Sequence, residues 1–112
     1  MSTRTDSELI HDILDAIGEV EQFTLGMSQS EFVADLKTLR AVELELIIIG
    51  EAASKISDAT QKANSQIPWQ LMKALRNRLV HAYFSVDPNV LWDTVQNNLP
   101  TLALKLRPLT MP

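Results

Sequence analysis

Apolar residues recur at helical spacing along most of the chain, and this pattern predicts its main elements. Over residues 9–20, acidic residues alternate with apolar ones, which predicts an amphipathic helix with an acidic outer face. A Ser28-x-x-Glu31 capping box opens a second helical region that runs to Ile56, with a break near Asp35. The apolar positions of this region alternate by three and four, as in a packed helix seam: Leu39, Val42, Leu46, Ile49, Ala53 and Ile56.

The second half of the chain contains two further start signals. Residues 57–67 are polar and weakly periodic, so we expect a loop with some fraying helix. Pro68 suits the first turn of a third helix, and Asp87-Pro88 suits the cap and first turn of a last one, which we expect to kink near Pro100. With no alternating strand pattern, the chain is predicted to be all-α, an up-and-down bundle of four or five helices forming a single domain over residues 1–112.

The second helical region is apolar on more than one side. Leu44, Ile47 and Ile48 widen its apolar stripe beyond a single seam, so this helix needs two neighbours, one of which could belong to another subunit. Gly50 lies in the middle of the same helix, where glycine costs about 1 kcal/mol relative to alanine. A close backbone approach to another helix would explain this glycine.

Composition excludes several classes of protein. The hydrophobic fraction of 46% and the charged fraction of 21% are those of a globular protein. The absence of cysteine excludes disulfides, zinc–thiolate sites and thiol catalysis. The first residues lack the apolar segment of a signal peptide, and the longest apolar run, Leu46–Ile49, is too short to cross a membrane, so we expect a cytoplasmic protein.

Charge is distributed unevenly. The net charge of −4 argues against a nonspecific nucleic-acid binder, whose affinity depends on neutralising phosphates. Residues 59–86, however, contain no Asp or Glu and carry a charge of +4, which leaves −8 for the rest of the chain. The cations are Lys62, Lys73, Arg76 and Arg78. Lys73 and Arg78 are therefore candidates for RNA binding, although as single residues they are ordinary surface cations.

Residues 76–83, at the end of the third predicted helix, contain most of the candidate functional side chains. Arg76, Val80 and Tyr83 project from one side of an ideal helix, whereas Asn77 and His81 share another side. Arg76 and His81 are separated by about 140° around the helix axis. They can meet one ligand only if the helix ends there, or if a second copy of the motif supplies the partner group.

These residues suit metal-independent cleavage of RNA. His81 can move protons near neutral pH, Arg76 can pair two phosphate oxygens, and Asn77 could fix the imidazole or hold an oxygen. A base beside a fixed cation favours phosphodiester cleavage by the 2′-hydroxyl of RNA, without a metal or other cofactor. The spacing alone is more often that of a helix-end histidine and a surface arginine, and a tyrosine such as Tyr83, taken alone, is more often a capping or core aromatic.

The string R-x-x-x-x-H-x-Y, as Arg76, His81 and Tyr83, resembles the signature of HepT-like proteins of the HEPN superfamily. Three other segments resemble the same family in the same order: the Ile48–Ala53 "iiGEAa" helix, Ile67-Pro68-Trp69 with Leu75-Arg76-Asn77, and the Phe84–Pro100 tail. The resemblance implies a short helical protein that forms a homodimer, with the motif lining a cleft between subunits. Many family members are ribonuclease toxins of prokaryotic toxin–antitoxin pairs.

The resemblance also implies roles for single residues. By this resemblance Arg76 and His81 are the catalytic residues and Asn77 is a polar helper. Tyr83 is the residue that accepts AMP from a minimal nucleotidyltransferase antitoxin, and this modification silences the toxin. Glu51 follows Gly50 and could either orient a residue of the site or form a salt bridge between helices. The alternative function is a non-catalytic helical dimer that binds a nucleotidyltransferase partner or a nucleotide.

Overall fold

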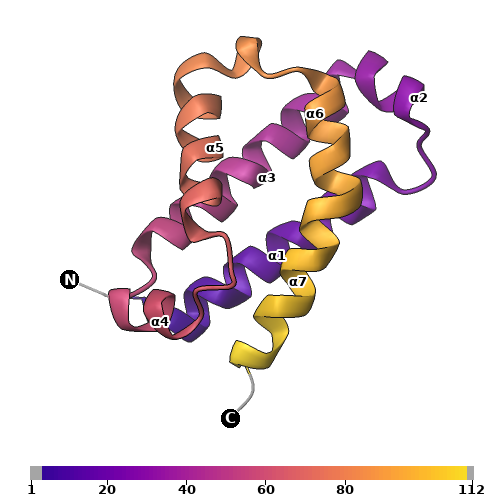
Figure 1. The fold of residues 1–112 in the computed structure, drawn as a ribbon. Helices are drawn as coiled ribbons and strands as arrows, with labels where there is room; N and C mark the ends of the chain where they lie inside the picture. The colour runs from indigo at the N-terminus through magenta and orange to yellow at the C-terminus, as the bar shows by residue number, and fades with distance from the viewer. Residues whose placement is uncertain (1–3, 111–112) are drawn as a thin grey trace.

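Four long helical segments and two short helices make up residues 4–110, the part of the chain that this computed structural model describes (Figure 1). In chain order the elements are α1 (Asp6–Thr24), α2 (Gln29–Ala34), α3 (Leu36–Lys55), α4 (Asp58–Ala63), α5 (Trp69–Ala82), the 3-10 turn η1 (Tyr83–Ser85), α6 (Pro88–Asp93), the π turn η2 (Thr94–Asn98), α7 (Leu99–Leu106) and the 3-10 turn η3 (Arg107–Thr110). Residues 4–110 contain no strand, so the predicted all-α class is confirmed.

The long helices form two layers (Figure 1). α1 and α3 pack against each other, and α5 packs along α3 on one side. The continuous segment α6–η2–α7 occupies the other side, where α7 contacts α1 and α6 contacts α2. α5 and α7 therefore lie over the α1–α3 pair without forming a third large helix interface between themselves. Within residues 4–110, none of the helices combines the length and apolar character that a membrane crossing requires.

Local start signals place most helix boundaries where the sequence predicts them. The Ser28 hydroxyl accepts a hydrogen bond from the Glu31 amide at 3.2 Å, and the Glu31 carboxylate accepts one from the Ser28 amide at 2.9 Å. Asp35 is non-helical and caps α3, and Asp87 caps α6 with Pro88 in its first turn. These caps satisfy backbone N–H groups that would otherwise have no partner within the helix.

The segment predicted as a loop over residues 57–67 is more ordered than expected, because it contains α4. Ser57 caps this helix, and Asp6 of α1 holds the cap in place. The Asp6 carboxylate accepts hydrogen bonds from the Ser57 amide at 2.9 Å and from the Ser57 hydroxyl at 2.6 Å. The Ser57 and Thr60 side chains also keep the pKa of Asp6 below its usual value. Pro68 precedes α5 as its cap residue instead of lying in its first turn.

The irregularity expected at Pro100 takes the form of a π turn. Pro100 lies near the start of α7 and cannot donate the backbone hydrogen bond that a regular helix needs there. The preceding residues widen into η2, where the Leu99 amide donates to the Thr94 carbonyl. A π turn adds one residue to the helical ring, so the chain continues into α7 instead of breaking.

One continuous apolar core lies between the two layers. Its fully buried side chains come from every long helix and from α2, and include Ile13, Phe32, Val42, Leu79, Leu91 and Leu106. Trp69 is buried, and its indole N–H donates to the Asn64 carbonyl at 3.1 Å. Trp92 packs against the Phe32 ring with the ring centres 5.3 Å apart. Both tryptophans therefore serve as anchors of the core.

Gly50 is the point of closest approach between α3 and α5. A Cβ atom added to Gly50 would overlap the Cβ of Arg76 and lie 2.7 Å from the Met72 carbonyl oxygen. Because backbone atoms form part of this contact, a rotamer change could not relieve the overlap. The close helix approach predicted from Gly50 is confirmed, and its partner is the helix that carries the motif.

We expect Gly50→Ala to lower the free energy of unfolding by about 1–3 kcal/mol, because α5 must shift to admit the methyl group. Gly18→Ala is the matched control: Gly18 is also helical, but nothing lies within 4 Å of an added Cβ. Alanine at that position should raise the stability by about 0.5–1 kcal/mol. Urea denaturation of both variants measures the difference, and an equal effect of the two substitutions would contradict the close approach.

Two glutamates of α3 are buried, with different surroundings. Glu43 accepts a hydrogen bond from Arg40 at 2.7 Å, whereas one carboxylate oxygen of Glu45 is buried without a hydrogen-bond partner within residues 4–110. Burial raises the pKa of Glu45, and the neighbouring carboxylate of Glu19 on α1 raises it further. Glu45 is therefore a destabilising charge in the α1–α3 interface at neutral pH.

The raised pKa of Glu45 gives a pH-dependent prediction. The folded protein binds this proton more tightly than the unfolded chain, so stability falls as the pH rises from the ordinary value of 4.5 through the raised pKa. Glu45→Gln should therefore raise the melting temperature at pH 7 and change it little at pH 4, as followed by circular dichroism. Glu43→Gln, which loses an ion pair, should give no such gain. A melting temperature unchanged by Glu45→Gln at pH 7 would refute the argument.

Candidate active site on α5

The motif occupies the last turns of α5 and the η1 turn that follows. α5 ends at Ala82, whose backbone leaves the helical region, and Tyr83 begins η1. Arg76 and His81 both lie inside α5, so the helical separation of about 140° between them applies. Of the two ways in which they could meet one ligand, an early helix end is not realised in this chain.

Arg76 points toward α3 and forms an ion pair there. Its Nη1 atom donates to the Oε1 atom of Glu51 at 2.6 Å, and the Arg76 side chain is 25% exposed. Its Nε atom is buried and has no hydrogen-bond partner within residues 4–110. Glu51 therefore forms a salt bridge between α3 and α5, one of the two roles that the sequence left open, and its partner is the motif arginine.

Asn77 and His81 lie on the exposed side of α5. Neither side chain forms a hydrogen bond within the described part of the chain, so Asn77 does not fix the imidazole of His81 there, and the other role considered for Asn77, holding an oxygen, stays a prediction. Both groups are available to a ligand or to another protein surface. His81 lies in the last turn of its helix.

Tyr83 is half-exposed and packs against a residue that sequence reasoning missed. The guanidinium of Arg40, from α3, lies 4.7 Å from the centre of the Tyr83 ring, in cation–π geometry. Arg40 and Glu51 are eleven residues apart, about three turns of helix, so they share one face of α3. That periodicity is a signal that could have placed Arg40 beside the motif once Glu51 was considered.

The two candidate RNA-binding cations have different surroundings. Lys73 lies 3.5 Å from the side-chain oxygen of Gln61 in α4, at the opposite end of α5 from Tyr83. Arg78 is exposed and donates to the hydroxyl and the carbonyl of Ser85, at 3.3 and 2.8 Å. Arg78 therefore fastens η1 to α5, and its free donors face solvent.

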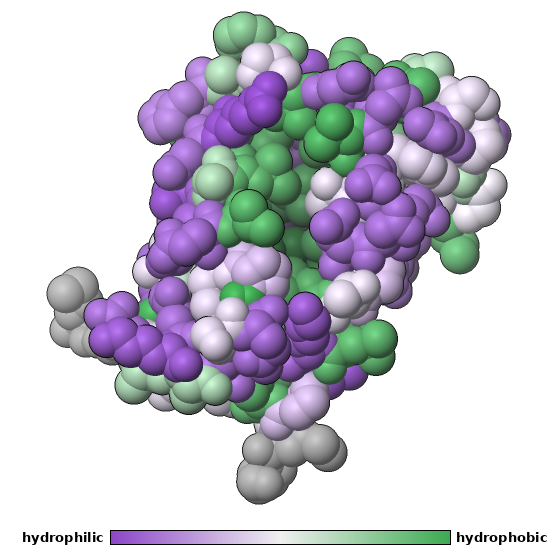
Figure 2. Space-filling view, viewed as in Figure 1, coloured by the Kyte–Doolittle hydropathy of each residue, from purple (hydrophilic) through white to green (hydrophobic). Residues whose placement is uncertain are grey.

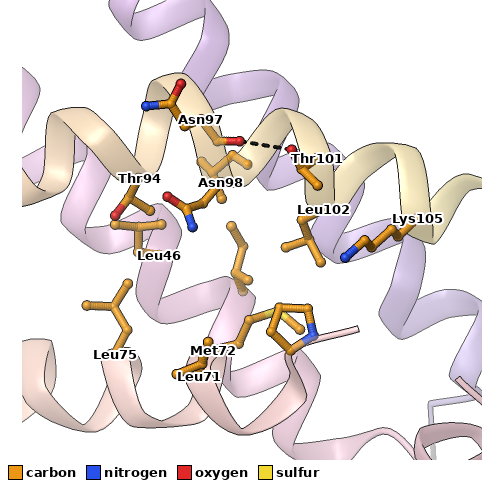
Figure 3. Close-up of a pocket in the computed structure, with 13 residues that line it drawn as sticks. Leu46, Leu71, Met72, Leu75, Thr94, Asn97, Asn98, Thr101, Leu102 and Lys105 are labelled. Carbon is orange, nitrogen blue, oxygen red and sulfur yellow. Dashed lines mark hydrogen bonds between the residues drawn. The ribbon is translucent and has the colours of Figure 1, made fainter. Parts of the chain in front are cut away.

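An apolar groove lies elsewhere on the molecule. Figure 2 shows an apolar depression between polar rims, over the space between α5 and the α6–α7 segment in Figure 1. Its volume is about 350 Å³, with Leu46 and Ile49 of α3 as its floor. Leu71, Met72 and Leu75 form one wall, and Asn98 lies on the opposite wall with its amide directed inward (Figure 3). None of the motif residues lines this groove.

Within residues 4–110 no group of three or more His, Cys, Asp or Glu side chains is arranged to hold a metal ion.

Comparison with known proteins identifies the family. The family model described as ribonuclease HepT-like matches residues 13–109, which include most of α1, all the later helices through α7 and the whole motif. The chain therefore belongs to the ribonuclease HepT-like family. No solved structure gives a significant match to the chain.

Individual relatives carry matching names. A protein of Thermococcus cleftensis named "Probable ribonuclease HepT" is 40% identical over 106 residues, which cover 95% of this chain and 96% of that protein. Two proteins of Methanocaldococcus jannaschii, each provisionally named an RNase, are similar over most of their length. One is 36% identical over 81% of this chain and 75% of its own, and the other is 34% identical over 91% and 94%.

Proposed function

We propose that this protein is a metal-independent endoribonuclease that acts as the toxin of a prokaryotic toxin–antitoxin pair. Arg76 and His81 are its catalytic residues, Asn77 assists them, and two copies of the chain form the cleft. The observation that carries the proposal is a complete family motif in which Arg76 is held against α3 while His81 and Asn77 remain open to solvent. The ribonuclease names of the relatives agree with RNA as the substrate.

The proposed reaction uses the 2′-hydroxyl of RNA as the nucleophile. His81 accepts the hydroxyl proton, the 2′ oxygen attacks the adjacent phosphorus, and the bond from phosphorus to the 5′ oxygen breaks. The products are a 2′,3′-cyclic phosphate and a departing 5′ oxygen, which takes up a proton from water to become a 5′-hydroxyl end. Arg76 stabilises the negative charge that builds on the phosphate oxygens, in a geometry to which its planar guanidinium is suited.

A second copy of the chain explains how diverging residues could serve one phosphate. The face of α3 that bears Arg40 and Glu51 also exposes Leu44, which is 57% exposed. Beside it, α5 and η1 expose Val80 by 49% and Phe84 by 80%. Apolar side chains gathered next to a polar site are typical of an interaction surface. Two-fold pairing of this surface would bring Arg76 of one copy toward His81 of the other.

We also propose that AMP transfer to Tyr83, by a minimal nucleotidyltransferase antitoxin, silences the enzyme. The Tyr83 ring is half-exposed at the end of α5, two residues beyond His81. An adenylyl group there would place bulk and negative charge beside the catalytic residues and repel RNA phosphates. Intact mass of the protein after co-expression with a minimal nucleotidyltransferase, compared between the wild type and Tyr83→Phe, would show whether Tyr83 is modified.

The activity can be tested directly. We expect the purified protein to cleave RNA in the presence of a chelator, to leave DNA of the same sequence intact, and to produce cyclic phosphate ends. His81→Ala should lower the cleavage rate by about 10²–10⁴-fold, because the proton acceptor is lost. His11→Ala, on the exposed face of α1, is the matched control and should cleave like the wild type. A strict metal requirement would exclude the mechanism, and RNA binding without cleavage would favour the non-catalytic alternative.

Pairing of two copies at the site can be tested by complementation. Two-fold pairing gives two Arg76–His81 pairs, each shared between the copies, so in a heterodimer of Arg76→Ala and His81→Ala chains one pair loses both groups and the other keeps both. If each cleft takes its arginine and histidine from different copies, the purified heterodimer should recover about half of the wild-type rate, while both parent homodimers stay inactive. A heterodimer of Arg76→Ala with an Arg76→Ala/His81→Ala chain is the control and should be inactive. Failure of the first heterodimer to exceed this control would refute the shared cleft.

A further inference from the structure

We infer that Glu51 is a positioning residue for Arg76: it holds the guanidinium in the orientation in which it binds a substrate phosphate. The inference rests on the proposed function for its catalytic consequence, but the fixation itself is a property of the folded chain. It begins with the ion pair, in which Arg76 Nη1 donates to Glu51 Oε1 at 2.6 Å. A bond this short between charged groups belongs to the stronger class of hydrogen bonds in proteins.

The base of the Arg76 side chain is fixed by packing. Its Cβ and Cγ atoms lie where a Cβ of residue 50 would be, so they rest directly on the backbone of Gly50. No other residue type could occupy position 50 without displacing α5. Gly50 and Glu51 are neighbours in sequence, so one turn of α3 holds the arginine at both its base and its tip.

The hydrogen bonds that Arg76 leaves open define what it can bind. Glu51 engages Nη1, and Nε is buried within the helix interface. The remaining capacity lies mainly on Nη2, at the end of a side chain that is 25% exposed. An arginine with few free rotations loses less conformational entropy when it binds an oxyanion, and a misplaced one can cost about a hundredfold in rate.

Two other roles for Glu51 make different predictions. If it were only a link between α3 and α5, its loss would lower stability but leave the rate per folded molecule unchanged. If it were a competitor that masks Arg76 from RNA, its loss would tighten RNA binding and would not slow the reaction. A positioning role predicts a slower chemical step with nearly unchanged binding. Steady-state kinetics separates these three cases.

The experiment compares Glu51→Ala and Glu51→Gln with the wild type and with Glu21→Ala, an exposed glutamate on α1 away from the site. We expect Glu51→Ala to lower kcat by about 10- to 100-fold with KM changed less than about threefold. Glu51→Gln keeps an oxygen acceptor for Nη1 and should recover part of the loss. Glu21→Ala should match the wild type. A wild-type kcat in folded Glu51→Ala, or a lower KM with undiminished kcat, would overturn the inference.

A second measurement does not depend on turnover. In nitrogen-15 NMR spectra, the Nε–H signal of Arg76, assigned by its loss in Arg76→Lys, should be sharp and shifted in the wild type. In Glu51→Ala it should move toward the position of exposed arginines, and in Glu51→Gln it should fall between the two. If the wild type cleaves no RNA, the proposed function fails while this test of fixation still stands. An Arg76 signal unchanged by Glu51→Ala overturns the inference whatever the activity.

Discussion

The contact between Gly50 of α3 and Arg76 of α5 is the constraint on which the arrangement of the site depends. Glycine lets the two helices approach until the arginine side chain lies on the α3 backbone. This approach sets the distance and the rotation of α5, and with them the direction of every side chain on that helix. Arg76 therefore faces inward to Glu51, while Asn77 and His81 face solvent. Packing and the proposed chemistry share this contact, so a change at Gly50 would affect both.

That geometry also explains why a chain of 112 residues would need a partner. A small domain has one core and no room for an enclosed site, so catalytic groups must be presented on its surface. On α5 the two key groups diverge around the helix axis, and no element folds back to bring them together. A second copy related by two-fold symmetry would supply the missing group from the same sequence. The exposed Leu44 and Val80 beside the motif are the surface that such pairing would cover.

The sequence predicts what depends on local interactions and misses what depends on contacts between distant segments. The caps at Ser28 and Asp87 act within a few residues, so the local sequence is sufficient to predict where α2 and α6 begin. The local pattern predicts a loop where α4 forms, because the contact that holds this helix comes from Asp6, about fifty residues earlier in the chain. The π turn before Pro100 also escapes prediction from the sequence. Either a kink or a wider turn can accommodate the loss of the backbone N–H donor at Pro100.

The charge of the site illustrates the same limit. Along the sequence, residues 59–86 carry four cations and no acid, which suggests a strongly positive surface. In space, Glu51 from α3 pairs with Arg76, and Arg78 is turned toward the Ser85 carbonyl. One copy therefore offers RNA less free positive charge than its sequence indicates, and affinity for a polyanion rises with the number of phosphates neutralised. A cleft formed by two copies would double that number, whereas Arg40, which lies beside Tyr83, is itself paired with Glu43. Weak RNA binding by each single copy is thus compatible with a nuclease that would act only as a dimer.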